Sequence, residues 1–249
     1  MNRDLARAYA FLARGEMAGA RREPSSVGTA VFDDAVPRRL DSNFLRVERD
    51  ASPEEVLEEA RRLGRRMIHV EDTEVGERLA PFFAERRWNV RRHIVMAQLR
   101  EPEPGRNGDS SLVEEVGEES LRAARHQVVT GQPWGTPEVM EHLFAGKRLI
   151  AHRVKTRFLA LKVDGEVASY TDLYQDGADA QIEDVGTVHE HRCRGYASTV
   201  ILAAIDIARR DGAEFVFLVA DQDDWPKELY RRLGFDELGY YVKLIAPHT

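Results

Sequence analysis

The chain has 249 residues, of which 43% are hydrophobic and 32% are charged, so it can bury a core and is neither a disordered nor a fibrous protein. The formal net charge of −7 opposes non-specific binding to nucleic acid, which depends on neutralising phosphates. The single cysteine, Cys193, excludes an intrachain disulfide and a multi-cysteine zinc site.

The first half predicts alternating helices and strands. Ser52, Pro53 and Glu55 form the clearest helix start, because Ser52 can cap, Pro53 suits the first helical position and Glu55 completes a capping box. We expect helices at residues 4–17, 53–63 and 75–87 and strands at 28–32, 43–47, 67–70 and 93–99. The N-terminal segment has no long apolar run, which favours neither a signal peptide nor a membrane span.

The second half follows a polar stretch at residues 101–110 that is rich in Pro and Gly and reads as a linker. This linker divides the chain into expected domains at residues 1–104 and 110–249. Asp164-Gly165 between two apolar runs predicts a hairpin. We expect strands at residues 112–116, 158–163, 167–174, 180–188, 215–219 and 240–244, and helices at 118–129, from 137 to near Gly146, at 196–210 and at 226–233.

Two motifs in this second half resemble those of one enzyme family. Residues 188–197 read VHEHRCRGYA, and Arg192, Gly195 and Ala197 fit the pattern Arg or Gln, two residues, Gly, one residue, Gly or Ala. This pattern is the acyl-CoA pyrophosphate loop of the GNAT superfamily of N-acyltransferases. Residues 229–235, LYRRLGF, are similar to the family's signature of Tyr, three residues and Gly-Phe. The resemblance covers residues 112–244.

The resemblance implies acetyl-CoA as the co-substrate. A turn of main-chain N–H groups that leads into a helix N-terminus suits a pyrophosphate, because those donors have no partner within the helix and the helix dipole is positive there. The main chain of the preceding strand would pair with the pantetheine amides. Asp223 departs from the family's frequent asparagine, and an ionised carboxylate can accept but not donate a hydrogen bond. The candidate cofactor-binding residues are Gly186, Thr187, Val188, Arg192, Cys193, Arg194, Gly195, Tyr196, Ala197, Ser198 and Asp223.

The catalytic proton transfers need an acid and a base, and the sequence offers candidates for both. The family assigns to the tyrosine that Tyr230 matches the role of general acid, giving a proton to the departing thiolate. Glu183, directly or through water, is the preferred base and Asp184 the alternative, since neighbours in a strand point to opposite faces and only one can face the acceptor. No metal is expected, because His189 and His191 lack a matched carboxylate set.

The first half can be laid on the second as a repeat. In that alignment Phe83 falls at Tyr230, and Trp88 falls at Phe235. Phe83 has no hydroxyl, and residues 48–51, which would replace the phosphate loop, contain no glycine. The predicted fold is therefore α/β with two GNAT-like mixed-sheet halves: a degenerate half at residues 1–104 and a complete acyltransferase domain at 110–249.

The expected function is an N-acetyltransferase that moves an acetyl group directly from acetyl-CoA to a primary amine on a small molecule or peptide. The alternatives are a silent acyl-CoA-binding sensor or regulatory module, and a structural module that binds no CoA. We expect a cytoplasmic protein without nucleic-acid or membrane partners, with a homodimer as a candidate assembly. Trp134, in the loop at residues 131–137, is a candidate for lining the acceptor pocket.

Overall fold

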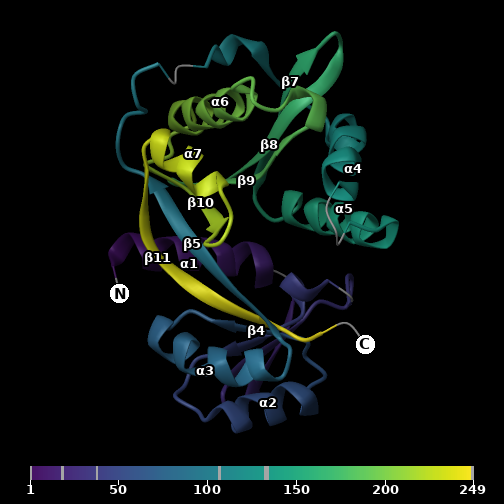
Figure 1. The fold of residues 1–249 in the computed structure, drawn as a ribbon, viewed down its shortest axis with the longest axis vertical. Coiled ribbons are helices and arrows are strands. Elements are labelled where there is room, and N and C mark those ends of the chain that lie inside the picture. Colours follow the sequence, from purple (N-terminus) through teal and green to yellow (C-terminus); the bar gives the residue numbers. More distant parts are fainter. Residues whose placement is uncertain (1, 18–19, 38, 106–107, 132–134, 248–249) are drawn as a thin grey trace. The chain divides into compact units, whose positions relative to one another are not determined.

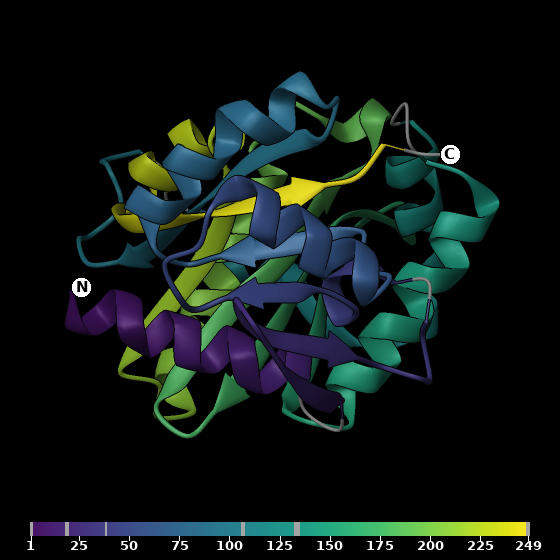
Figure 2. The same cartoon turned by 90° about the horizontal axis from the view of Figure 1, so that it is seen from below.

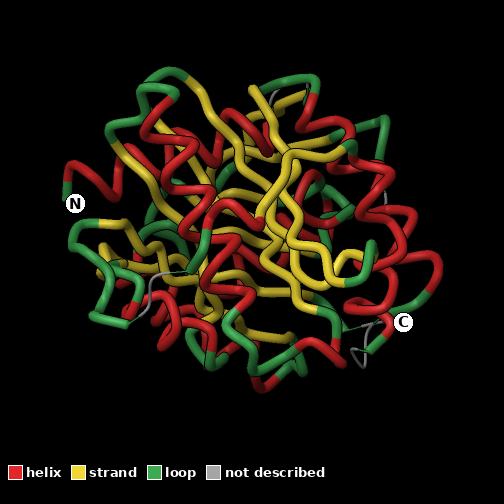
Figure 3. The backbone as a smooth tube through the Cα atoms, turned by 90° about the horizontal axis from the view of Figure 1, so that it is seen from above, coloured by secondary structure: helices red, strands yellow, loops and turns green. Residues whose placement is uncertain are grey.

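The computed structural model of the chain describes residues 2–17, 20–37, 39–105, 108–131 and 135–247 (Figure 1). Its contacts divide it into two compact units. Helices and strands both occur along the backbone (Figure 3). Unit 1 comprises Met1–Val95, Ala220–Asp224 and Leu238–Thr249, and unit 2 comprises Met96–Val219 and Trp225–Glu237. The units therefore interleave along the sequence, and the division at residues 1–104 and 110–249 stays a prediction.

Unit 1 is built on a mixed sheet. Its strands follow the order β1-β2-β3-β4-β11-β5, with β3 parallel and β11 antiparallel to β4. The capping box predicted at Ser52 is confirmed, since its hydroxyl accepts from the Glu55 N–H and the Glu55 carboxylate accepts from the Ser52 N–H. The elements are α1 (Arg3–Met17), β1 (Arg21–Ser25), β2 (Gly28–Phe32), β3 (Leu45–Val47), α2 (Pro53–Arg62), β4 (Met67–Val70), α3 (Thr73–Glu85), and most of β5 (Asn89–Gln98) and β11 (Phe235–Ile245).

The two faces of the unit 1 sheet bury different side chains, because successive residues of a strand alternate between faces. Ile68 and Val70 of β4 pack in one apolar cluster with Leu57 of α2 and Leu79 of α3. Met67 belongs to a second cluster, with partly buried side chains that include one from α1. Helix α1 thus covers the face opposite α2 and α3 (Figure 2).

The α1-facing side carries a group of aromatic and titratable side chains. The rings of His93 and Tyr241 stack with centroids 5.2 Å apart, and the buried His69 ring lies 4.5 Å from the Tyr241 ring. Burial, followed by the charge of Lys243, lowers the pKa of His93 to about 4. The other charged groups that act on His93 are those of Asp41, Asp221 and Arg91.

We expect the free energy of unfolding to fall as the pH is lowered from about 6.5 to about 4. The unfolded chain protonates His93 near pH 6.5 while the folded chain does not, so acid favours unfolding by on the order of 3 kcal/mol over that range. Urea titrations at several pH values measure this slope. His93→Phe keeps a ring beside Tyr241 and should make the unfolding free energy less dependent on pH in this range. An unchanged slope in this variant would contradict the assignment of the slope to His93.

Unit 2 likewise contains strands in both parallel and antiparallel pairing. Its strands follow the order β10-β9-β8-β7-β6, in which β9 and β10 are parallel and the other pairs are antiparallel. Helix α6 packs against β8 and β9 on one face, and α4 contacts β9 and β8 as well. The elements are β6 (Val113–Val116), α4 (Arg122–Thr130), α5 (Pro137–Ala151), β7 (Lys155–Val163), β8 (Glu166–Asp176), β9 (Asp179–Thr187), α6 (Tyr196–Arg210), β10 (Phe215–Asp221) and α7 (Pro226–Arg232).

In unit 2 the predictions that rest on turn residues agree best with the structure. The hairpin turn is confirmed, with Asp164 at φ 53° and Gly165 at φ 86°, as a type I′ turn requires. The bounds of α6 are confirmed at both ends. The predicted end of a helix near Gly146 is wrong, because α5 continues to Ala151. An interior glycine weakens a helix by only about 1 kcal/mol, and the next residue, Lys147, is anchored by Asp172.

Candidate functional site

The loop between β9 and α6 reverses the chain on residues with left-handed backbone. Val188 fixes its start, since its side chain is buried and its N–H donates to the Ala168 carbonyl at 3.0 Å. Cys193 has φ 62° and Gly195 has φ 81°. Helix α6 begins immediately afterwards, at Tyr196. This loop is the predicted phosphate loop, and the structure places it directly at a helix N-terminus.

The phosphate loop presents a run of main-chain donors. Among the residues that the structure describes, no hydrogen-bond partner is found for the main-chain N–H groups of residues 193–198. A Cβ built on Gly195 would meet no atom within 4 Å, so the space beside it is open. Such a turn, at the positive end of a helix dipole, suits an anionic phosphate group. The loop therefore fits the pyrophosphate of an acyl-CoA.

The side chains of the loop have different surroundings. Arg192 is exposed, and its Nε donates to the Thr187 carbonyl at 3.3 Å. Cys193 and Arg194 are also exposed. Ser198 is buried in the first turn of α6. Tyr196 and Ala197 are partly buried.

The main chain of β9 is open along one edge. Its parallel pairing with β10 ends at Ile182 and Leu218, whereas its pairing with β8 continues to Thr187. Among the described residues, no strand is thus paired with the edge of residues 183–187 that faces away from β8. An extended polar chain can pair with such an edge as an added strand. The contact of Gly186, Thr187 and Val188 with pantetheine stays a prediction.

Gly186 has a packing role of its own. A Cβ at this position would lie 2.2 Å from the ring of Tyr170, its register partner on β8. The Gly186 carbonyl accepts from the Ser169 hydroxyl at 2.9 Å, and the hydroxyls of Ser169 and Thr187 lie 3.0 Å apart. A larger side chain at residue 186 would displace a buried tyrosine. Gly186 is therefore required by the fold, independently of a ligand.

A β-bulge interrupts β9 beside the predicted base. Tyr170 pairs with Gly186 and Asp172 pairs with Glu183, so Asp184 and Val185 together lie opposite one residue of β8. Asp184 adopts φ 54°, in the left-handed region. Val185 packs toward α6 in an apolar cluster with Val200.

The bulge changes which residues share a face. The Asp184 carboxylate contacts Arg125 and Lys147, which also bind Asp172. Asp172 is the register partner of Glu183, and paired residues of antiparallel strands point to the same face. The expectation that Glu183 and Asp184 point to opposite faces is therefore wrong, because the bulge breaks the alternation. The Glu183 carboxylate accepts from the Gln181 amide at 2.8 Å.

Behind the bulge lies a buried group of ion pairs that the sequence analysis missed. The Lys147 ammonium lies 2.6 Å from Asp172 and 2.9 Å from Asp184, and Arg125 pairs with both carboxylates. The Tyr174 hydroxyl donates to Asp172 at 3.0 Å. Burial opposes the charge of Lys147, but the two carboxylates outweigh it and hold its pKa well above the usual value. The one available signal was Asp172, the single charged residue in the predicted strand 167–174.

Tyr230 lies in α7 and is 8% exposed. Its ring meets that of Phe235 edge-on, with centroids 6.2 Å apart. In unit 1 the rings of Phe83 and Trp88 meet in the same way at 4.9 Å. Arg87 follows the helix and precedes Trp88, and it has a left-handed φ of 61°. Gly234 takes the corresponding place before Phe235, with φ 90°. The two halves therefore share a helix-to-strand turn in which only Tyr230 carries a hydroxyl.

Two predicted positions are not joined to this site. Asp223 is exposed in the segment Ala220–Asp224 of unit 1, where its N–H donates to the Asp221 carboxylate at 3.0 Å. Its contact with the cofactor stays a prediction. Trp134 lies outside the described residues.

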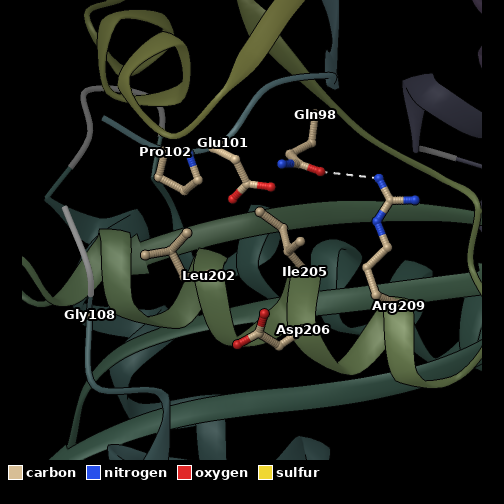
Figure 4. Close-up of a pocket in the computed structure, with 8 residues that line it drawn as sticks. All are labelled: Gln98, Glu101, Pro102, Gly108, Leu202, Ile205, Asp206 and Arg209. Carbon is tan, nitrogen blue, oxygen red and sulfur yellow. Dashed lines mark hydrogen bonds between the residues drawn. The ribbon is translucent and has the colours of Figure 1, made fainter. Parts of the chain in front are cut away.

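A groove of about 400 Å³ lies on the outer side of α6 (Figure 4). Arg209 at one end donates to the Gln98 amide oxygen at 3.1 Å. Its lining includes the acidic residues Glu101 and Asp206, which makes it a poor place for a phosphate. It contains none of the predicted site residues; its lining is Gln98, Glu101, Pro102, Gly108, Leu202, Ile205, Asp206 and Arg209.

A comparison of sequences points to the same region as the open edge of β9, the loop and α6. The profile of the acetyltransferase (GNAT) family matches residues 121–235. These residues belong to the GNAT family. No curated protein sequence matches the chain. Within the described residues, no helix has the length and apolar character needed to cross a bilayer.

Solved structures extend the likeness from the GNAT domain to the whole chain. A conserved protein of unknown function from Staphylococcus epidermidis has a TM-score of 0.68 at 14% identity, over 92% of this chain and 95% of that one. A GCN5-related N-acetyltransferase from Kribbella flavida has a TM-score of 0.64 at 18% identity, over 100% of this chain and 97% of that one. A tandem GNAT protein from the clavulanic acid biosynthesis pathway has a TM-score of 0.51 at 14% identity, over 91% of this chain and 82% of that one. The fold of two GNAT-like halves is thus confirmed.

Proposed function

We propose that this protein transfers an acetyl group from acetyl-CoA to a primary amine, on a small molecule or a peptide, in the cytoplasm. The observation that carries the proposal is the run of main-chain N–H groups at residues 193–198, which have no hydrogen-bond partner in the described part of the chain and lie at the start of α6 within the GNAT domain. These donors can hold a pyrophosphate without burying a cationic side chain. The open edge of β9 supports the same reading, since the pantetheine arm is extended and carries amides.

In the proposed reaction an amide bond forms between the amine nitrogen and the acetyl carbon while the thioester bond breaks. Glu183, on the bulged strand, takes the proton that the amine loses. The Tyr230 hydroxyl gives a proton to the departing thiolate. Transfer is direct, without a covalent intermediate on the enzyme. Both candidate residues lie in unit 2, which also contains the phosphate loop.

The test combines turnover with binding. Release of free thiol from acetyl-CoA should rise above the background rate when a suitable member of a panel of primary amines is added. Calorimetry should give one CoA per chain, because residues 48–51 of unit 1 offer no glycine turn. Saturable CoA binding without turnover on any amine would favour the sensor instead. Absence of CoA binding would exclude both functions, and two CoA per chain would contradict the assignment of chemistry to unit 2 alone.

A further inference from the structure

Two buried hydrogen-bond donors of unit 2 have no partner among the residues that the structure describes. Arg125 of α4 is 2% exposed, and its Nε and Nη2 donate to the carboxylates of Asp184 and Asp172, but its Nη1 has no acceptor there. The hydroxyl of Tyr170, on β8, is fully buried and also lacks a partner. Because an unpaired buried donor is unfavourable, two of them in one place point to a group that binds them.

The two donors belong to neighbouring side chains beside β9. The guanidinium carbon of Arg125 lies 5.6 Å from the centre of the Tyr170 ring. A Cβ on Gly186 would lie 2.4 Å from the Tyr170 hydroxyl, so this hydroxyl lies against the main chain of Gly186. Gly186 is part of the open edge of β9. The donors therefore lie next to the stretch of strand that we propose for the acyl donor.

The charges around the donors favour an uncharged oxygen as their partner. Two cations pair with two carboxylates in this buried group, namely Arg125, Lys147, Asp172 and Asp184. A ligand carboxylate would add a charge that nothing in this group balances, which is costly in a buried place. A carbonyl oxygen adds no charge, and its two lone pairs can accept from both donors.

Tyr170 remains a donor over the working pH range. Burial, followed by the charge of Asp184, holds the pKa of Tyr170 well above its usual value, so the hydroxyl keeps its proton. Asp184 is also the most exposed member of the ion-paired group, with 28% of its side chain accessible. A ligand therefore approaches this group from the side of Asp184.

We propose that Arg125 Nη1 and the Tyr170 hydroxyl bind a carbonyl oxygen of the acceptor, on the carbon next to the one that carries the amine. This inference rests on the proposed acetyl transfer and names its substrate class, the α-amino amides, which include peptide N-termini. One carbon separates the amine from the carbonyl in such compounds. Binding the carbonyl beside Gly186 thus keeps the amine close to the edge of β9, and Arg125 and Tyr170 determine which amines are accepted.

Three amines test whether the carbonyl is recognised. Alaninamide, alanine and isopropylamine share the amine-bearing carbon and a methyl group, and their remaining group is a neutral carbonyl, a carboxylate or a second methyl. The measured quantity is the ratio of kcat/KM for alaninamide to kcat/KM for isopropylamine, compared between protein variants, because the intrinsic reactivity of each amine then cancels. An alanine tripeptide beside alaninamide distinguishes a peptide acceptor from a small one.

Tyr170→Phe keeps the ring and removes one of the two donors. We expect this variant to lower the ratio about 3- to 10-fold, the effect of one lost hydrogen bond to a neutral group. Its melting temperature should not fall, because the hydroxyl has no partner in the described part of the protein. Tyr9→Phe is the matched control: Tyr9 of α1, in unit 1, is 4% exposed, its hydroxyl also lacks a described partner, and the ratio should stay at the wild-type value.

A binding measurement tests the same contact without turnover. In a protein with isotope-labelled tyrosine rings and no acetyl-CoA, the NMR signal of Tyr170 is the one that disappears in Tyr170→Phe, and that of Tyr9 the one that disappears in Tyr9→Phe. Alaninamide should move the Tyr170 signal and leave the Tyr9 signal in place. Isopropylamine should move neither.

Three results would overturn the proposal. They are a wild-type ratio in Tyr170→Phe, a higher kcat/KM for alanine than for alaninamide in the wild type, and a Tyr170 signal that alaninamide does not move. A protein that binds CoA but acetylates no amine would remove the proposed function instead. In that case the movement of the Tyr170 signal alone decides whether the two donors bind a carbonyl.

Discussion

Tyr230→Phe should lower kcat by about 10²- to 10⁴-fold, the usual effect of losing a general acid. The affinity for acetyl-CoA should barely change, because the variant keeps the ring that meets Phe235 and loses only the hydroxyl. Steady-state kinetics with saturating amine, together with calorimetry, separate these two quantities. The result would identify the hydroxyl, rather than the packing of α7, as the contribution of Tyr230.

Tyr240→Phe is the matched control for this variant. It also removes one tyrosine hydroxyl, which donates to Glu77 at 3.0 Å in unit 1, and costs about 1 kcal/mol of stability as a typical lost hydrogen bond. Its kcat should equal that of the wild type. Full activity in Tyr230→Phe, or an equal loss in both variants, would show that the departing thiolate receives its proton elsewhere.

Gly195→Val should weaken acetyl-CoA binding about 10- to 100-fold. The new side chain would project into the open space beside the phosphate loop and keep the pyrophosphate away from the donors of residues 193–198. Losing even one charge-assisted hydrogen bond costs about 1.5–3 kcal/mol, and each 1.4 kcal/mol is tenfold in affinity. Calorimetric titration with CoA measures the change directly.

The backbone strain of this substitution needs its own control. Gly212 has φ 90° at the opposite end of α6, and a Cβ there would also meet no atom within 4 Å. Gly212→Val therefore carries a comparable left-handed penalty without approaching the loop. It should lower the melting temperature about as much as Gly195→Val but leave CoA affinity intact. Equal losses of affinity would point to strain rather than to a blocked phosphate site.

The sequence predicted best those features that depend on neighbouring residues. The capping box of α2, the Asp164-Gly165 turn and the start of α6 after Gly195 each rest on a few consecutive side chains with a strong backbone preference. Strand β1 was missed, because RREPS is polar and contains Pro24, and among the residues that the structure describes it forms a ladder only with β2. Its partner, rather than its composition, makes it a strand.

The site shows the same limit more sharply. The phosphate loop and Tyr230 could be proposed from local patterns, whereas the bulge could not. Asp184 is ion-paired with Arg125 and Lys147, which are distant in sequence and come from two different helices. Regular alternation along β9 was the reasonable expectation, and the bulge overturns it.

The path of β11 has a consequence for how the protein is made. Its residues from Leu238 onward belong to unit 1, where the strand lies between β4 and β5 in the sheet. During synthesis, the first 95 residues therefore leave the ribosome long before β11, the strand that separates β4 from β5 in the finished unit. We expect a fragment of residues 1–95 to remain unfolded or to associate through its unfilled gap, and a synthetic peptide of β11 to rescue it.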